Sequence, residues 1–238
     1  MDNVEIYFRD IIKEKEIMIN SFEKNVNNYF NDVIYFSKIH KQYENELERY
    51  TSLKFNVFKY VNVNENKISE IIVDILKPNG EHGQNSLFLD EFLKILELPK
   101  INKIPTINTE VLTKQHINSQ RRMDILIDWL NFGVMIENKP RYDDKKDQLK
   151  DYAEDLTNKY GKENFVMVYL SNDGHLPSEI SISEHYKQEL EDKKQFIHIT
   201  YNNKFRKWIE SCINNCQSEK YKWFLRDFLD NTLNNYLW

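Results

Sequence analysis

Apolar and polar positions recur along this chain with two different periods, and each period predicts a type of element. Residues 1–60 carry a helical period with many polar positions, and glycine and proline are rare, so two or more helices are predicted there. Residues 65–77 form a well-marked amphipathic helix that ends at Pro78, and residues 86–97 form a shorter one. The apolar stripe of the helix at 65–77 consists of Ile68, Ile71, Ile72, Ile75 and Leu76.

After residue 106 the period changes to that of short strands. Strands are predicted at 107–113, 123–129 and 133–139, and the tight connection Asn131-Phe132-Gly133 makes the last two a hairpin. The order of all elements predicts an α/β fold with a mixed central sheet flanked by helices and with helical additions at both ends. The remaining predictions are a helix at 143–160, strands at 164–170 and 196–201, and helices at 203–215 and 219–237.

Ionisable residues stand at the ends of two predicted core strands. Asp124 begins the apolar run of one strand, and Glu137 and Lys139 end the next. Because side chains alternate between the faces of a strand, Glu137 and Lys139 point to one face and Asn138 to the other. A turn centred next to Asn131 would place Asp124 on the face of Glu137 and Lys139. The group is then either a catalytic site or a cross-strand ion-pair network.

Two carboxylates aimed at one point suit Mg²⁺, a hard cation that takes oxygen ligands and can hold a phosphate substrate. We expect Asp124 and Glu137 to be metal ligands, with the backbone carbonyl of Asn138 as a third. Lys139 could stabilise charge on a phosphoryl oxygen, or orient and deprotonate an attacking water. This pattern suits phosphodiester hydrolysis.

Three further side chains are candidates for the same site. Glu65 lies within the apolar stripe of the first amphipathic helix and should point inward, although an acid there could instead stabilise the helix N-terminus. Gln148 and Tyr152 are four residues apart, hence on one face of a helix, and could hold a phosphate or Lys139 in place. Glu110, one strand earlier, is expected to be structural.

Length and composition limit the classes of function. With 238 residues, 40% of them hydrophobic and 30% charged, the chain resembles a soluble globular protein of one domain. No apolar run is long enough for a membrane helix, and the first residues lack the features of a signal peptide. Cys212 and Cys216, the two cysteines, are expected to be packing residues of a cytoplasmic protein.

Charge gives this chain no general attraction to nucleic acid, because the formal net charge is −5. Binding of a polyanion would rest on local patches such as Arg121-Arg122, whereas the lysines of residues 143–151 alternate with aspartates and predict a solvated mixed-charge face. Aromatic residues gather near the C-terminus, where they are expected to pack in the core or to form a homodimer through the C-terminal helices. These aromatics are Trp208, Trp223, Phe224, Phe228 and Trp238.

Together these residues resemble the PD-(D/E)XK nuclease superfamily, whose core has the same order of helix, three strands, helix and strand. Asp124 with Glu137-Asn138-Lys139 is similar to its D...ExK signature, and Gln148 with Tyr152 is similar to the QxxxY motif of its RecB-like branch. The stretches ENKISEIIVDILKPNGEHGQNSLFLDEFL, NTEV, RRMDILI, MIENKP and DQLKDY, in this order, resemble a bacterial family of uncharacterised PD-(D/E)XK proteins. The chain departs from that family at two places. Ile68 stands where the family often has a histidine, and residues 141–148, RYDDKKDQ, differ from the family's common stretch.

The resemblance implies a restriction-endonuclease-like fold and a metal-dependent nuclease that leaves a 5′-phosphate and a 3′-hydroxyl. Its cofactor would be Mg²⁺, for which Mn²⁺ can substitute. Its substrate would be DNA rather than RNA, and its role would be defence against foreign DNA. The nuclease core would span 61–202, with a helical region at 1–60 and helices at 203–238 packed on the core. Two alternatives are a catalytically silent nucleic-acid-binding or protein-interaction module on the same fold, and hydrolysis of RNA or a nucleotide. The implied catalytic set is Glu65, Asp124, Glu137, Lys139, Gln148 and Tyr152.

Overall fold

The structure is a computed structural model, and its contacts divide the chain into two compact units, Met1–Asn56 and Val57–Trp238. The first unit consists of a long helix, and the second holds a sheet covered by shorter helices. The residues that the structure describes are 2–52, 55–61, 63–114, 121–141, 144–172 and 174–236.

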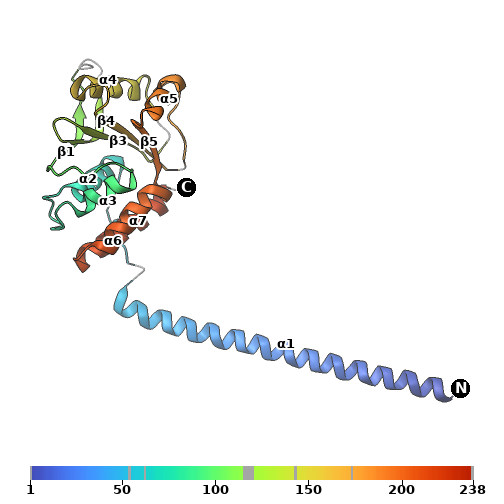
Figure 1. Cartoon of the computed structure of the whole chain (residues 1–238). Coiled ribbons are helices and arrows are strands. Elements are labelled where there is room, and N and C mark those ends of the chain that lie inside the picture. Colours follow the sequence, from blue (N-terminus) through green and yellow to red (C-terminus); the bar gives the residue numbers. More distant parts are fainter. Residues whose placement is uncertain are drawn as a thin grey trace. The chain divides into compact units, whose positions relative to one another are not determined.

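The first unit is one uninterrupted helix, α1 (Asp2–Thr51), of 50 residues (Figure 1). The prediction of two or more helices in residues 1–60 is therefore wrong. Residues 2–51 contain neither glycine nor proline, so no residue in this stretch breaks the backbone ladder of hydrogen bonds. At a rise of about 1.5 Å per residue the helix is about 75 Å long. The short 3₁₀ turn η1 (Val57–Lys59) belongs to the second unit.

The second unit is built on a mixed five-stranded sheet in the order β1-β2-β3-β4-β5. Antiparallel pairing joins β1 (Thr106–Leu112), β2 (Arg122–Asp128) and β3 (Gly133–Lys139). Parallel pairing joins β3 to β4 (Phe165–Ser171) and β4 to β5 (Phe196–Thr200). The five predicted strands are confirmed, and with them the predicted α/β fold with a mixed central sheet.

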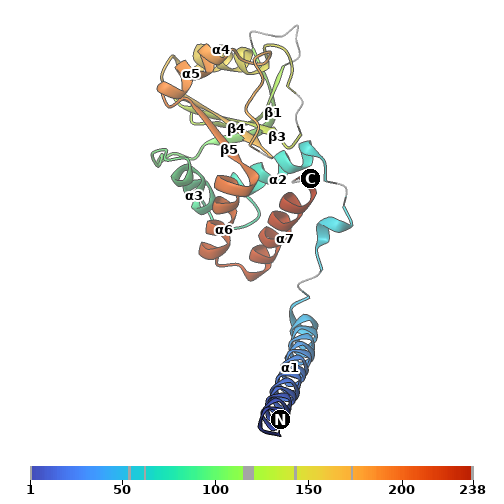
Figure 2. The ribbon, with the colours of Figure 1, turned by 90° about the vertical axis from the view of Figure 1, so that its right-hand side faces the viewer.

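Helices cover both faces of this sheet (Figure 1, Figure 2). Alternate residues of the central strands face the two layers: Ile125 and Ile136 pack on one side, and Leu126 and Met135 on the other. The first layer holds α2 (Glu65–Leu76), α3 (Leu87–Ile95), α6 (Arg206–Asn215) and α7 (Glu219–Tyr236), and the second holds α4 (Gln148–Tyr160) and α5 (Glu184–Asp192).

One helix begins later than predicted, and another helix was not predicted at all. The helix expected at 143–160 begins only at Gln148, because Asp147 adopts a left-handed backbone with φ of +55° that a helix cannot continue through. Residues 142 and 143 lie outside the described part of the chain. The polar segment between β4 and β5 contains α5, which the sequence did not predict because only Lys187 and Leu190 of this helix are buried.

The aromatic residues near the C-terminus belong to the core of their own unit. Trp208 and Phe228 are fully buried, Phe224 packs against them in the same cluster, and Trp223 is 39% exposed, while Trp238 lies outside the described residues. The expectation that these aromatics pack in the core is confirmed for Trp208 and Phe228, and the homodimer through the C-terminal helices stays a prediction. The two cysteines, both free and buried, are packing residues as predicted.

Within the described residues no helix combines the length and the low charge that a bilayer-spanning segment requires.

Candidate functional site

The hairpin β2–β3 brings the predicted acids together at one end of the sheet. The two strands pair in a register that joins Ile125 to Ile136, so the next position places Asp124 opposite Glu137. The turn lies just before Asn131, as the sequence predicted, and Trp129 N–H donates to the carbonyl of Phe132 across it at 3.0 Å. A shift of the register by one residue would have moved Asp124 to the opposite face from Glu137.

Glu137 and Asn138 point to opposite faces of β3. Glu137 is completely buried on the α4 face, where its Oε1 lies 3.0 Å from Lys139 Nζ. Asn138 points to the α2 face, where its Nδ2 donates to Ser69 Oγ at 3.1 Å and the hydroxyl of Tyr201 donates to its Oδ1. The alternation predicted for this strand is confirmed by these contacts. Asn138 thus joins the active end of β3 to the helical layer behind it.

The backbone of Asn138 also fixes the first acid. Its N–H donates to Asp124 Oδ2 at 2.7 Å, so the Asp124 carboxylate is held across the hairpin. An N–H donor stabilises a carboxylate over a carboxylic acid. The Asp124 side chain is consequently oriented before any ligand binds.

Glu65 stands in the first turn of α2 and is half-buried. Asn64 is the N-cap, since its side chain accepts from Lys67 N–H at 2.9 Å, so the helix start does not depend on Glu65 for its cap. The Glu65 carbonyl accepts from Asn138 Nδ2 at 3.3 Å. This contact fixes the start of α2 at the end of β3.

Gln148 and Tyr152 lie one turn apart on α4 and both reach the sheet. Gln148 Nε2 donates to Glu137 Oε1 at 2.8 Å and lies 3.1 Å from the Tyr152 hydroxyl. The Tyr152 hydroxyl in turn donates to the carbonyl of Arg122 on β2. The two side chains therefore connect α4 to β2 and β3, and they hold Glu137 rather than Lys139.

All six residues of the predicted catalytic set line one cavity of about 230 Å³ at the end of the sheet. Sequence reasoning thus selected side chains that the fold brings together from α2, β2, β3 and α4. The set consists of Glu65, Asp124, Glu137, Lys139, Gln148 and Tyr152.

The electrostatics of the cavity depart from those of free side chains. Burial raises the pKa of Asp124 from 3.8 to about 6, and burial together with the Asp124 charge raises the pKa of Glu137 well above its ordinary value. Burial alone would lower the pKa of Lys139, but the charges of Glu137 and Asp124 outweigh it and the pKa is raised. The lysine is therefore an ammonium at neutral pH, while the acids hold protons more readily than free carboxylic acids do.

One oxygen of the site is both buried and unbonded. Glu137 Oε2 has no hydrogen-bond partner among the described residues, although Oε1 of the same carboxylate has two. Buried carboxylate oxygens are usually paired with a donor or a cation. The oxygen is thus placed to accept a ligand that enters the cavity.

A comparison with protein families decides which fold family this site belongs to. The family model described as PD-(D/E)XK nuclease superfamily matches residues 55–230, which is most of the chain. The chain belongs to the PD-(D/E)XK nuclease superfamily. No curated protein and no solved structure gives a significant match to it. Its membership indicates a nuclease, and the acids at the end of the β2–β3 hairpin stand where the D...ExK signature predicted them.

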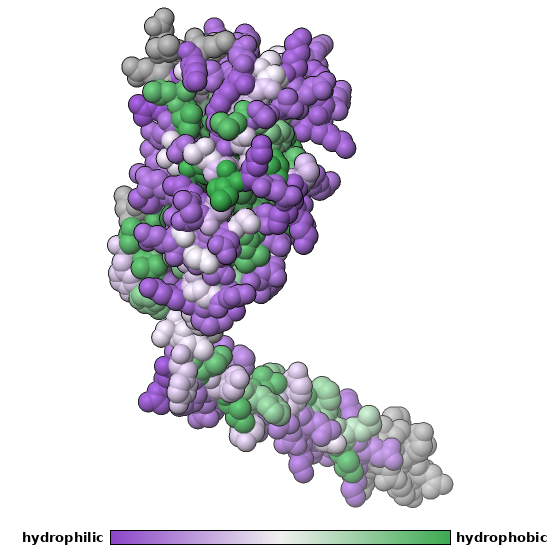
Figure 3. Space-filling model, turned by 60° about the vertical axis from the view of Figure 1, so that its left-hand side comes forward, coloured by the Kyte–Doolittle hydropathy of each residue, from purple (hydrophilic) through white to green (hydrophobic). Residues whose placement is uncertain are grey.

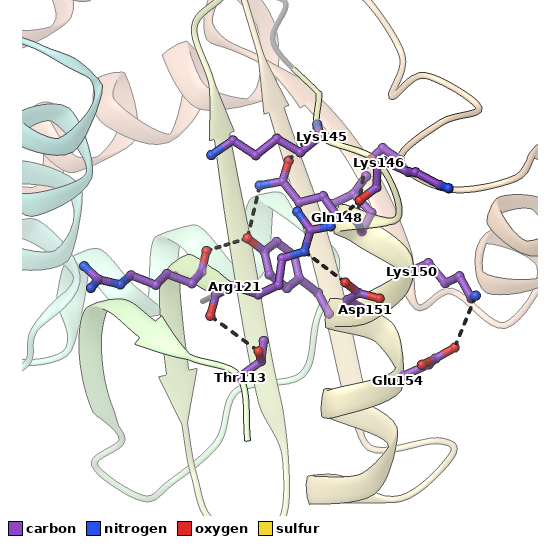
Figure 4. A network of polar contacts seen from close by, with 12 residues as sticks. Thr113, Arg121, Lys145, Lys146, Gln148, Lys150, Asp151 and Glu154 are labelled. Carbon is purple, nitrogen blue, oxygen red and sulfur yellow. Dashed lines mark hydrogen bonds and ion pairs between the residues drawn. The ribbon is translucent and has the colours of Figure 1, made fainter. Parts of the chain in front are cut away.

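Basic side chains complete the cavity of this PD-(D/E)XK protein, and sequence reasoning noted them only as local charge. Arg121, Arg122 and Lys145 line it together with the acids. Figure 4 shows Arg121 held beside α4, where its Nε donates to Asp151 Oδ2 at 2.9 Å and its guanidinium also donates to the carbonyl of Lys146. The arginine is therefore positioned by the protein before a substrate arrives.

The mixed-charge segment before and within α4 is sorted by sign rather than evenly solvated. Lys145, Lys146 and Lys150 are exposed, whereas Asp151 is buried against Arg121. Asp144 turns inward as well and accepts from Ser178 N–H at 2.6 Å. The predicted solvated face therefore holds for the three lysines, whereas Asp151 is buried in an ion pair with Arg121 and Asp144 accepts from the backbone of Ser178.

Glu110 has the structural contact expected of it and also lines the cavity. Its Oε2 lies 2.7 Å from Arg122 Nη1, and both side chains are about half exposed. Its backbone has a φ of +51°, which is uncommon for a residue with a side chain. Its negative charge is one of the smaller causes that raise the pKa of Asp124.

Proposed function

We propose that this protein is a divalent-metal-dependent nuclease that hydrolyses phosphodiester bonds at the cavity lined by Asp124, Glu137 and Lys139. The observation that carries the proposal is the buried Glu137 Oε2, which has no hydrogen-bond partner in the described part of the chain and belongs to a carboxylate opposite Asp124. Family membership supports the reaction class, since members of this superfamily are generally nucleases.

The residues present fit a divalent cation, although no group of three or more acidic, histidine or cysteine side chains among the described residues is arranged as a complete metal site. Asp124 and Glu137 would hold the cation, with the backbone carbonyl of Asn138 as a third oxygen ligand and Glu65 as a supporting acid. A bound Mg²⁺ or Mn²⁺ would polarise the phosphodiester and lower the pKa of water at the site. Incomplete ligand sets of this kind suit Mg²⁺, which keeps several waters.

Lys139 acts in this proposal through its charge. Because its pKa is raised, the ammonium persists at neutral pH and is a poor general base. It can instead stabilise negative charge on a phosphoryl oxygen in the transition state. Gln148 keeps Glu137 in position, and Tyr152 keeps Gln148 beside β2, so both are positioning residues.

The substrate proposed is DNA. The cavity lining pairs the acids with Arg121, Arg122 and Lys145, and two further outward lysines, Lys146 and Lys150, follow in the loop before α4 and on α4. Such a patch can attract a polyanion locally despite the net charge of −5. The preference for DNA over RNA, and a role in defence against foreign DNA, rest on the resemblance of the motifs to the bacterial family.

The test is a cleavage assay with supercoiled plasmid, linear duplex DNA, single-stranded DNA and RNA, each with Mg²⁺, Mn²⁺ or EDTA. We expect metal-dependent cleavage of at least one DNA substrate by the native protein and none in EDTA. Glu137→Gln should lose at least about 10³-fold in rate, because it removes a charge on which the proposed cation depends.

Glu163→Gln is a matched control on the loop between α4 and β4, away from the cavity, and it should cleave at the native rate. If the protein cleaves RNA and none of the DNA substrates, the proposed substrate DNA is wrong and RNA takes its place. Absence of cleavage for every substrate, together with absence of Mn²⁺ binding by calorimetry, would favour the catalytically silent module on the same fold.

A second expectation concerns the pH dependence of cation binding. Asp124 must lose its proton to bind a cation, and its pKa in the metal-free protein is raised to about 6. We therefore expect Mn²⁺ affinity to rise at least about tenfold for each pH unit below 6, and to keep rising until the Glu137 carboxyl, whose pKa is also raised, has lost its proton. Calorimetric titration from pH 5 to pH 8 should also detect protons released on binding, with more of them released at the acidic end.

An affinity that is constant from pH 5 to pH 8 would contradict binding at Asp124. Asp124→Asn provides the control, since this variant should bind Mn²⁺ weakly at every pH. The measurement does not depend on finding the right nucleic acid, so it tests the cation site separately from the substrate.

A further inference from the structure

The long helix α1 carries many large apolar side chains on its surface. Phe22 is 69% exposed and Phe36 is 66% exposed, and the other large apolar residues from Ile12 to Tyr50 are also exposed, except Val26, which is partly buried. Among its described residues, the first compact unit contains no second helix or strand against which they could pack. Figure 3 shows hydrophobic side chains recurring along the described part of this helix. An isolated helix with such a surface needs a partner in water.

These side chains follow a heptad repeat. Two positions of the repeat, three residues apart, are apolar over almost the whole helix from residue 12 to residue 50. The first position, a, is occupied by Ile12, Ile19, Val26, Val33, His40 and Leu47. The second position, d, is occupied by Lys15, Phe22, Tyr29, Phe36, Tyr43 and Tyr50.

The period distinguishes a helical partner from a globular surface. A stripe that repeats every 3.5 residues stays on one side of a helix only when the helix supercoils, because a straight helix has 3.6 residues per turn. A strict repeat sustained over more than five heptads is therefore typical of a left-handed coiled coil. Further exposed apolar residues, such as Met18, Phe30 and Ile39, flank the stripe, but they do not recur from heptad to heptad as positions a and d do.

We propose that α1 forms a parallel two-stranded coiled coil with α1 of a second copy of this chain. Position a is mostly β-branched, as at Ile19, Val26 and Val33, which is the a-position pattern of parallel two-stranded coiled coils, while aromatic residues take the place of their usual leucine at d. The five aromatic residues at position d would each bury about 150 Å² or more if covered. Their sum alone approaches the roughly 800 Å² per partner of a standard stable interface.

The charges beside the stripe favour a parallel over an antiparallel pair. In a parallel pair, the residue just before each a position lies beside the residue five positions later on the other helix, which follows a d position. Met18 would thus lie beside Glu23, and Ile39 beside Glu44. None of these pairs brings two like charges together. In an antiparallel pair that aligns residues 19–50 of both copies, Glu23 of each helix would lie beside Glu44 of the other. The two like charges would repel each other at both ends of the coiled coil. The polar His40 at an a position would meet its own copy only in the parallel register.

The parallel arrangement has a consequence for the second unit. Both α1 helices would end at Thr51 on the same side of the pair, so two copies of the second unit would be tethered to one end. A ligand bound by one copy would then meet a second identical site at a high effective concentration. The inference rests on α1 alone and holds whether or not the proposed nuclease activity is found.

The test is the mass of the full-length protein by sedimentation equilibrium. We expect twice the 28.9 kDa of one chain. The double variant Val26→Glu, Val33→Glu buries four unpaired charges in the pair and should raise the dissociation constant by about 10³-fold or more. The matched double variant Asn27→Glu, Asn31→Glu adds the same charge outside the stripe and should remain a dimer.

A cysteine variant tests the register without disturbing the stripe by charge. Under mild oxidation Val26→Cys should form a disulfide between two copies, because equivalent a positions face each other only in a parallel pair. Asn31→Cys, on the outer side, should not. The natural cysteines are both buried and do not compete.

Five results would overturn the proposal. A single-chain mass for the native protein would show that the stripe does not bind a second copy, and a mass of three or more chains would exclude two strands. A dimer that survives Val26→Glu, Val33→Glu, or that is lost equally in the matched control, would place the interface elsewhere. A dimer without a disulfide in Val26→Cys would exclude the parallel register.

Discussion

Asp124→Asn is expected to abolish cleavage and, at the same time, to stabilise the metal-free protein at neutral pH. Burial raises the pKa of this carboxyl from 3.8 to about 6, so the native state binds its proton more tightly than the unfolded state does. Stability therefore falls as the pH rises from about 4 to about 6, and the full cost is present above pH 6. A shift of this size corresponds to at most about 3 kcal/mol.

Asparagine removes that cost while it keeps an oxygen that can accept from Asn138 N–H, which donates to Asp124 at 2.7 Å. We expect Asp124→Asn to raise the free energy of unfolding by roughly 1–3 kcal/mol at pH 7.5 in EDTA. The gain should shrink toward zero at pH 4, where Asp124 itself is protonated. Urea unfolding at the two pH values, with circular dichroism as the signal, measures both quantities.

Asp128→Asn, four residues along the same strand, provides a control of opposite sign. Burial would raise the pKa of Asp128, but its hydrogen bond with Lys159 and other donors lower it, so its ionised form stabilises the fold. Asp128→Asn should therefore destabilise the protein at pH 7.5. A loss of stability in Asp124→Asn as well would contradict the claim that Asp124 opposes folding.

The arrangement of the site could be predicted from the sequence because it depends on local geometry. Strand alternation fixed the faces of Glu137 and Asn138, and a short hairpin left little freedom for the position of Asp124. The apolar stripe of α2 likewise placed Glu65 toward the sheet. Each of these steps involves residues within one element or across one tight turn.

The contacts that support the site could not be predicted, because they join residues far apart in the sequence. Tyr201 and Ser69 bond the Asn138 side chain across separations of 63 and 69 residues. The position of Arg121 beside the acids depends on Asp151 in α4, across 30 residues. A tyrosine after a strand or a serine within a helix carries no local signal of such a role.

The single long helix was missed for a different reason. Its apolar residues were recognised as helical, but a region of about fifty residues in a compact protein usually contains several helices with breaks between them. The heptad repeat and the absence of glycine and proline contradict such breaks. A period of 3.5 rather than 3.6 was the signal that distinguished one long helix from a helical bundle.

Lys139→Met is expected to produce the largest loss of stability at this site. Its ammonium lies 3.0 Å from Glu137 Oε1, and both side chains are almost completely buried. Methionine fills a similar space but leaves the Glu137 charge without its cation. Removal of one partner from a buried ion pair costs about 3–5 kcal/mol. We expect a loss of this size at pH 8, measured by urea unfolding in EDTA, together with loss of cleavage.

The loss should diminish as the pH falls toward 5. The pKa of Glu137 is already raised well above its ordinary value, and removal of the lysine raises it further. As the pH falls, the folded variant therefore binds a proton at Glu137 before the unfolded chain does, and this proton removes the unpaired charge. The double variant Glu137→Gln, Lys139→Met removes the unpaired charge and retains an oxygen that can accept from Gln148 Nε2. Its stability at pH 8 should return to within about 1 kcal/mol of the native value, while cleavage stays absent.

These two variants separate charge from packing. If the double variant is as unstable as Lys139→Met, the lysine contributes through the packing of its methylene groups and the pair carries little energy. If Lys139→Met is as stable as the native protein at pH 8, Glu137 is already protonated in the metal-free protein. In that case Asp124 and Glu137 would share one proton at neutral pH, and a cation would have to displace it. Cation binding at pH 8 would then release a proton, whereas binding to two ionised carboxylates releases none.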